Sequence, residues 1–169
     1  MPPTSPPPPE PAGTLRPASP GDLALLVGHH VAMFREIWEQ RGQALPPERE
    51  DALGQAYAAK LGAELTQGVC QAWLIEEGGQ GIASGAVSWL SLTPNPLDLA
   101  SRVGYLHSIY TAPAHRNRQC AQRLVQRLLE ECRRQGVRRV LLHASPAGRP
   151  VYEKFGFASA PETMRLIMD

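Results

Sequence analysis

The stretch that decides the fold is residues 104–134, which read GYLHSIYT, APAHRNRQ and CAQRLVQRLLEECRR. The first part predicts a strand over 103–111, which ends before Pro113 because proline has no N–H for a sheet ladder. The third part predicts a helix with apolar rows on one side: Cys120, Leu124, Leu128, Cys132, and Ala121, Val125, Leu129. Gly136 ends this helix, and the apolar run in 137–144 predicts a strand buried on both faces. Together they predict a right-handed crossover between two parallel strands.

The rest of the 169-residue chain fits one α+β domain, α/β-like around this crossover. Apolar spacing predicts a helix from Ser19 or Asp22 to about Gln40 and a second helix over 48–66. His30 lies beside the apolar face of the first helix and is interpreted as a packed histidine. Strands are predicted at 14–17, 69–76, 82–92 and 163–168, with a short helix over 149–154.

Charge is concentrated around the crossover. Residues 100–149 contain 10 arginines and two acidic residues, although the whole chain has a net charge of only +1. A near-neutral protein with one basic segment suits a compact anionic ligand better than extended nucleic acid. The alternative is that most of these arginines form a solvated helix face, and we favour it for Arg123, Arg127, Arg133 and Arg134.

The crossover helix is predicted to begin near Asn117 or Arg118. The first N–H groups of a helix have no partners within it and lie at the positive end of its dipole, so a phosphate can accept several of them. Arg116 and Arg118 add positive charge there. The alternative is that Asn117 only caps the helix. The loop lacks the glycines of a Walker or dinucleotide-binding motif.

Cysteine spacing and composition narrow the kinds of site and the cellular location that the chain fits. Cys70, Cys120 and Cys132 have no metal-site spacing, so no metal is expected, and an odd number of thiols favours the reducing cytoplasm. No apolar stretch approaches the roughly 20 residues of a membrane span. Residues 1–12 are predicted to be a disordered proline-rich tail, either idle or docking to an aromatic groove, and 13–169 to be the domain.

Three motifs in order resemble the GNAT superfamily of acyl-CoA-dependent N-acyltransferases. Arg116-Asn117-Arg118-Gln119-Cys120-Ala121 is similar to its phosphate loop, Thr111-Ala112-Pro113 to the end of its preceding strand, and Tyr152-Glu153-Lys154-Phe155-Gly156-Phe157 to its tyrosine motif. The segments 33–36 (MFRE) and 143–150 (HASPAGRP) resemble a bacterial GNAT group of uncharacterised function. The resemblance implies a GNAT fold, with a mixed sheet of six or seven strands, the parallel crossover and about four helices.

The resemblance also implies where acetyl-CoA binds as co-substrate. The backbone of the strand end should pair with the pantetheine arm, the loop should bind the pyrophosphate, and Ser145 replaces an asparagine that contacts CoA in many relatives. These residues are Ile109, Tyr110, Thr111, Arg116, Asn117, Arg118, Gln119, Cys120, Ala121, Gln122 and Ser145. Gln119 departs from the family, which has glycine there. Its side chain either crowds the phosphate or donates a hydrogen bond to it.

The family's chemistry gives roles to two further residues. Tyr152 would be the general acid for the departing thiolate, or else an aromatic packed beside Phe155 and Phe157. Relatives often use a strand glutamate as the base, but 103–111 and 137–144 contain none. His107 is the proposed substitute, with a structural histidine as the alternative. Alternation along the strand predicts that His107 faces the same side as Ile109 and Thr111.

The function implied is an N-acetyltransferase that moves an acetyl group from acetyl-CoA to a primary amine of a small molecule or peptide by direct attack. Arg35 and Glu36 are candidates for the acceptor pocket, or else helix-surface charges. The alternative function is a non-catalytic acyl-CoA-binding or sensing module on the same fold. Neither nucleic acid nor membrane is an expected partner, and the oligomeric state stays open, with a homodimer among the alternatives.

Overall fold

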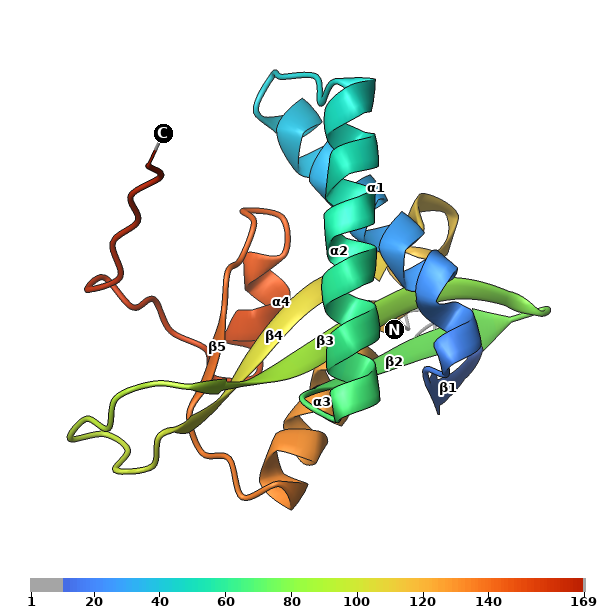
Figure 1. The fold of residues 1–169 in the computed structure, drawn as a ribbon. Coiled ribbons are helices and arrows are strands. Elements are labelled where there is room, and N and C mark those ends of the chain that lie inside the picture. Colours follow the sequence, from blue (N-terminus) through green and yellow to red (C-terminus); the bar gives the residue numbers. More distant parts are fainter. Residues whose placement is uncertain (1–10, 169) are drawn as a thin grey trace, which may run out of the picture.

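The computed structural model describes residues 11–168, and its sheet has five strands in the order β1-β2-β3-β4-β5. The pairs from β1 to β4 are antiparallel, and β4 and β5 are parallel, as the crossover predicts. The strands are β1 (Thr14–Pro17), β2 (Cys70–Glu77), β3 (Gln80–Ser91), β4 (Arg102–Thr111) and β5 (Val140–Leu142). The helices are α1 (Leu23–Gln40), α2 (Pro47–Gln67), α3 (Cys120–Arg134) and α4 (Arg149–Glu153). The α+β class and the mixed sheet are confirmed (Figure 1).

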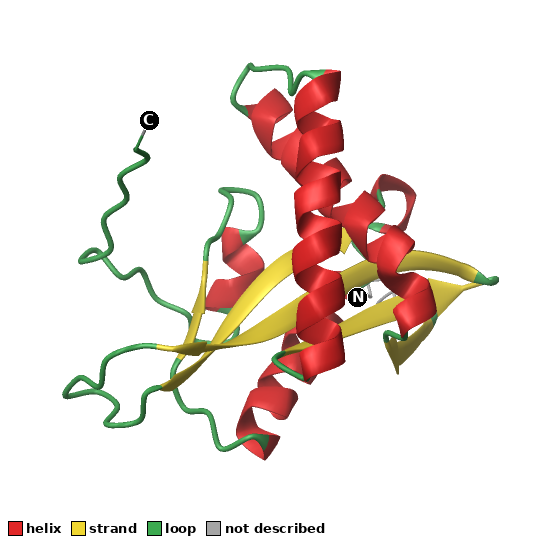
Figure 2. Cartoon of the chain, viewed as in Figure 1, coloured by secondary structure: helices red, strands yellow, loops and turns green. Residues whose placement is uncertain are grey.

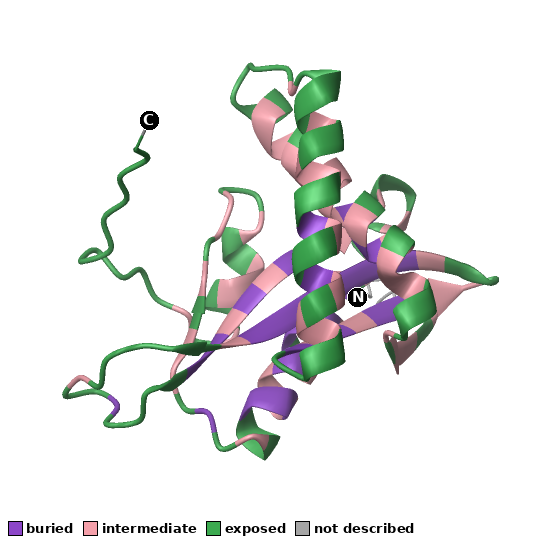
Figure 3. Ribbon diagram, viewed as in Figure 1, coloured by how far each residue is buried: buried purple, intermediate pink, exposed green. Residues whose placement is uncertain are grey.

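Helices cover both faces of the sheet (Figure 2). On one face α1 and α2 bury a cluster made of Leu26, Tyr57, Leu61, Cys70, Ala72 and Ala86. On the other face α3 packs through Val125, Leu128 and Cys132 against β3 and β4. Burial is greatest along the central strands and falls off toward the far ends of α1 and α2, which extend beyond the sheet (Figure 3). The sheet is therefore the middle of three layers.

The amphipathic pattern of α3 correctly predicts its buried face. Its arginines match the predicted solvated face only in part: Arg133 and Arg134 are exposed, whereas Arg123 and Arg127 are partly buried. Arg123 donates to the carbonyl oxygens of Ala12 and Gly13. Arg127 lies 4.1 Å from the ring centre of Trp73 and is paired with the buried Glu131. Arg123 thus joins α3 to the segment before β1, and Arg127 joins it to Trp73 on β2.

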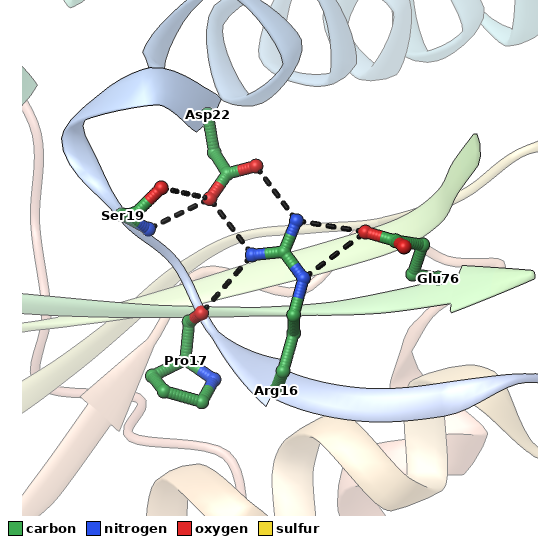
Figure 4. A network of polar contacts seen from close by, with 5 residues as sticks. All are labelled: Arg16, Pro17, Ser19, Asp22 and Glu76. Atoms are coloured by element: carbon green, nitrogen blue, oxygen red, sulfur yellow. Dashed lines mark hydrogen bonds and ion pairs between the residues drawn. The ribbon is translucent and has the colours of Figure 1, made fainter. Parts of the chain in front are cut away.

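An arginine network anchors the first strand. Arg16 on β1 donates to both carboxylate oxygens of Asp22, each at 2.9 Å, and to Glu76 on β2 (Figure 4). The same Asp22 carboxylate accepts from the backbone N–H and the hydroxyl of Ser19, and these charge-assisted bonds hold the pKa of Asp22 well below its usual range. The network fixes the entry of α1 onto the sheet edge.

The C-terminal part differs from the prediction. Only Val140–Leu142 form β5, and Leu141 is 36% exposed, so the strand is not buried on both faces. It lies at the edge of the sheet and no further strand covers it among residues 11–168. The predicted strand at 163–168 is wrong, because this segment pairs with no strand and four of its side chains are at least 80% exposed. The described sheet therefore has five strands rather than six or seven.

The predicted proline-rich tail falls largely outside the described residues. Of its last two residues, Ala12 is fully buried against Ile75 and Ile82. The boundary at residue 13 stays a prediction. No helix between residues 11 and 168 is long and apolar enough to span a membrane.

Candidate active site

The parallel strands of the crossover separate partway along β4. Pairing between β4 and β5 covers only Gly104–Leu106 and Val140–Leu142, although β4 continues to Thr111. Within residues 11–168, no strand pairs with this side of β4 beyond Leu106. The end of β4 therefore offers free backbone groups to an extended ligand, as a sheet edge does.

A β-bulge lies at the point where the strands separate. Ser108 has a φ of 56°, and the register of β3 with β4 shifts between Ser84 and Ala86. The extra residue in a bulge interrupts side-chain alternation. His107 consequently lies on the α1/α2 side, near Tyr57, whereas Ile109 lies on the α3 side with Leu128. The prediction that His107 and Ile109 share a face is wrong for this reason.

The loop before α3 has two residues in the left-handed region. Asn117 and Gln119 each have a φ of 61°, so the helix begins at Cys120 and not near Asn117 or Arg118. Gln119 is the N-cap residue, and its side chain makes no capping bond. In the described part of the chain, the N–H groups of Gln119, Cys120, Ala121 and Gln122 have no hydrogen-bond acceptor. Four adjacent donors thus point out of this loop and helix start.

Neither loop arginine has a free guanidinium. Arg116 binds both carboxylate oxygens of Glu36 on α1, at 2.8 and 2.6 Å, and also donates to the Thr111 carbonyl. Arg118 binds Glu77 on β2 at 2.7 and 2.9 Å. These carboxylates neutralise much of the predicted positive charge. Any phosphate at this loop would therefore be held mainly by backbone N–H groups.

The other acceptor-pocket candidate, Arg35, is also engaged. It forms two bonds of 2.6 Å with Glu50 and so ties α1 to α2. Its side chain is half exposed. Glu36, paired with Arg116, ties α1 to the loop before α3. In the structure, Arg35 and Glu36 join elements together, and their predicted role in acceptor binding stays a prediction.

His107 lies within a polar network that the sequence did not reveal. Its Nε2 atom is 2.9 Å from the hydroxyl of Ser88, and its Nδ1 atom is 2.9 Å from that of Ser108. Ser88 in turn donates to Glu64 on α2 at 2.9 Å. The Ser108 hydroxyl is 2.8 Å from Nδ1 of His30 on α1. Burial lowers the pKa of His107 to about 4 and is also the main cause that lowers the pKa of His30 to about 4.

The tyrosine motif lies on the other side of the sheet. Tyr152 is on α4 and packs into the cluster beneath β3 and β4, with its ring 6.0 Å from that of Phe157. Burial raises the pKa of the Tyr152 phenol, so it stays protonated at neutral pH. The hydroxyl of Ser145 accepts the N–H of Gly148 at 3.1 Å and shapes the turn before α4. Packing thus holds Tyr152 in place, but whether it acts in catalysis stays a prediction.

The sequence matches the Acetyltransferase (GNAT) family over residues 30–157, which is most of the chain. This chain belongs to the GNAT family of acetyltransferases. The match includes β4, the loop before α3, and Tyr152. A search of curated proteins gave no match. Among residues 11–168, no three His, Cys, Asp or Glu side chains are placed to hold a metal ion.

Solved structures of GNAT proteins have the same fold. The GCN5-related N-acetyltransferase from Ralstonia eutropha JMP134 is 28% identical, with a TM-score of 0.81 over 91% of this chain and 97% of that one. The predicted acetyltransferase from Clostridium acetobutylicum, whose crystal structure is with acetyl-CoA, is 27% identical, with a TM-score of 0.79 over 91% and 95%. Glucosamine-6-phosphate N-acetyltransferase from Arabidopsis thaliana, at 19% identity and a TM-score of 0.59 over 92% and 98%, shares the fold.

Proposed function

We propose that this GNAT protein is an N-acetyltransferase that moves an acetyl group from acetyl-CoA to a primary amine of a small molecule or peptide. The observation that carries the proposal is the pair of free backbone surfaces at the crossover. The N–H groups of Gln119–Gln122 lack acceptors among the described residues, and the end of β4 lacks a neighbouring strand there. A pyrophosphate and an extended amide-containing arm need donors and acceptors of these two kinds.

The residues proposed to hold acetyl-CoA follow from these surfaces. The backbone of Ile109, Tyr110 and Thr111 would pair with the arm. The amides from Asn117 to Gln122 would hold the pyrophosphate, and Ser145 lies at the turn that follows β5. Because Arg116 and Arg118 are paired with carboxylates, they would act by shaping the loop. Acetyl-CoA would supply an activated acyl thioester.

One side chain would accept a proton during the transfer and another would donate one. An attacking amine must lose a proton, and the neutral, buried His107 would accept it through its hydrogen-bond network. Tyr152, kept protonated by burial, would donate a proton to the departing thiolate. A phenol suits this role because its usual pKa of about 10 is close to that of a basic thiolate.

A non-catalytic acyl-CoA-binding or sensing module is the second candidate. The observation that favours it is that both ring nitrogens of His107 already have partners within the protein. No glutamate in β4 or β5 offers a more direct base. The two candidates share the cofactor and differ only in turnover.

Calorimetry with acetyl-CoA, combined with a thiol-release assay, tests the proposal. The acceptors would be an alkyl diamine, an amino sugar, a free amino acid and an unacetylated peptide. Binding together with thiol release on one of these supports the transferase. Binding without release on any of them favours the sensing module, and absence of binding contradicts both.

Tyr152→Phe provides the matched test of the proposed acid. The substitution keeps the packed ring and removes only the hydroxyl, so acetyl-CoA affinity should change less than twofold, whereas kcat should fall about 100-fold. A variant with the wild-type kcat would remove Tyr152 from the mechanism. Equal losses of affinity and kcat would mean that its role is to pack α4.

A further inference from the structure

An unbroken path of hydrogen bonds crosses the α1/α2 side of the sheet. It runs from His30 Nδ1 to the Ser108 hydroxyl (2.8 Å), and from there to His107 Nδ1 (2.9 Å). From His107 Nε2 it continues to the Ser88 hydroxyl (2.9 Å) and then to the carboxylate of Glu64 (2.9 Å). The path therefore joins α1, β4, β3 and α2 through five side chains.

The hydrogens along this path have a fixed direction. A carboxylate only accepts, so Ser88 donates its hydrogen to Glu64 and must accept from His107 Nε2–H. A neutral imidazole carries one hydrogen, so His107 Nδ1 accepts, from Ser108 at 2.9 Å and from the more distant Tyr57 hydroxyl at 3.4 Å. Ser108 then accepts from His30 Nδ1–H, and Nε2 of His30 is left bare. Every donor on the path points toward Glu64.

The surroundings keep both imidazoles neutral. The ring of His30 is stacked on Tyr57 at 3.6 Å between centres, and the ring of Phe34 lies at 70° to it, 5.0 Å away between centres. Burial is the main cause that lowers the pKa of His30 and His107 to about 4, and the positive charge of Lys60 contributes to the same shift. Around His107, Glu64 opposes the effect of Lys60, and His30 adds to it. The direction assigned to the hydrogens holds only while the rings of His30 and His107 are both neutral.

The two ends of the path, His30 Nε2 and Glu64, differ in their hydrogen-bond partners. Nε2 of His30 has no hydrogen-bond partner among residues 11–168. At the other end, the Glu64 side chain is 22% exposed and accepts a 2.5 Å bond from the half-exposed Lys60. His30 Nε2 is thus an acceptor without a partner among the described residues, and Glu64 is a carboxylate in contact with solvent.

We propose that these five side chains are a proton relay that accepts the proton of the acceptor amine at His30 Nε2 and delivers a proton to Glu64. The inference rests on the proposed acetyl transfer. One proton enters at His30, and each of the four hydrogens along the path moves to the next acceptor. Both imidazoles change tautomer and both hydroxyls keep one hydrogen. Glu64 ends protonated and releases its proton to water.

A pH–rate comparison tests the relay. Glu64→Gln removes the terminal acceptor, and at pH 7 it should lower kcat about 10- to 100-fold and leave acetyl-CoA affinity within twofold. The deficit should vanish toward pH 10, because the acceptor amine, whose pKa is about 8 for an α-amine and about 10 for an alkyl amine, then loses its proton unaided. Glu48→Gln is the matched control, since Glu48 is an exposed carboxylate in the first turn of the same helix. This control should stay near wild type.

Wild-type turnover in Glu64→Gln at pH 7 would overturn the relay. So would a deficit of the same size at every pH, which would indicate a structural role. The assay uses whichever amine of the panel gives thiol release. If no amine does, the acetyl transfer fails, and the relay is then judged by the tautomers of the two histidines.

Those tautomers can be measured without turnover. Long-range ¹⁵N–¹H correlation spectra of the full chain with ¹⁵N-labelled histidine should show His30 as the Nδ1–H tautomer and His107 as Nε2–H. His30→Gln and His107→Gln variants assign the signals. In Glu64→Gln the preference should weaken at both rings, whereas Glu48→Gln should leave it unchanged. An Nε2–H tautomer at His30 in the wild type would overturn the relay.

Discussion

Gln119→Gly should stabilise the protein, because Gln119 has a φ of 61° immediately before α3. A non-glycine residue in this region costs about 1–2 kcal/mol, which glycine avoids. Glycine also loses more backbone entropy on folding, about 0.5–1 kcal/mol. The net gain in unfolding free energy should be about 0.5–1 kcal/mol. For a chain of this length, that corresponds to a rise in Tm of roughly 1–4 °C.

Urea denaturation and calorimetry would measure the effect, with Gln126→Gly as the matched control. Gln126 is an exposed residue in the interior of α3, where the same substitution should cost about 1 kcal/mol. Opposite signs for the two variants are expected. A Gln119→Gly protein that is no more stable than wild type would refute the strain at this position. In the same sample, tighter acetyl-CoA binding would mean that the glutamine crowds the phosphate, and weaker binding that its amide is a ligand.

Three further predictions concern stability. Gly104→Ala should destabilise by about 1–3 kcal/mol by urea denaturation, because its Cβ would lie 2.9 Å from Cys132 Sγ. The cost should shrink in a Cys132→Ala background. By contrast, Gly28→Ala in open space on α1 should stabilise by about 0.5–1 kcal/mol. The unfolding free energy should also fall as pH drops from 6.5 to 4, because burial lowers the pKa of His107 and His30 to about 4 in the folded state while the unfolded chain binds protons from about 6.5. His107 alone should account for about 3 kcal/mol of this loss, and an unchanged pH slope in His107→Asn would contradict that assignment.

The crossover could be predicted because its signals are local. The apolar rows of α3 and the break at Pro113 involve residues close together in the chain, and both correspond to the observed elements. The order of the loop and the tyrosine motif likewise identified the GNAT family, which the family match confirms.

The errors arise where distant segments meet. The bond between Arg116 and Glu36 joins residues 80 apart, and that between Arg118 and Glu77 joins residues 41 apart. Apolar spacing within a segment gives no sign of such long-range ion pairs. The sequence therefore predicted a more positive loop before α3 than the structure shows. The predicted helix start is too early because Asn117 and Gln119 both have a positive φ, although neither is a glycine.

The sequence by itself therefore determined the helices, most of the strands and the family, because propensity, apolar spacing and motif order are properties of neighbouring residues. Only the tertiary structure decided the face on which His107 lies, since a single extra residue at Ser108 reverses the alternation of β4. It also decided the partners of His107, because helices far away in the sequence bring Glu64 and His30 to the same side of the sheet. Packing, rather than local pattern, assembled the polar network from which the proposed relay follows.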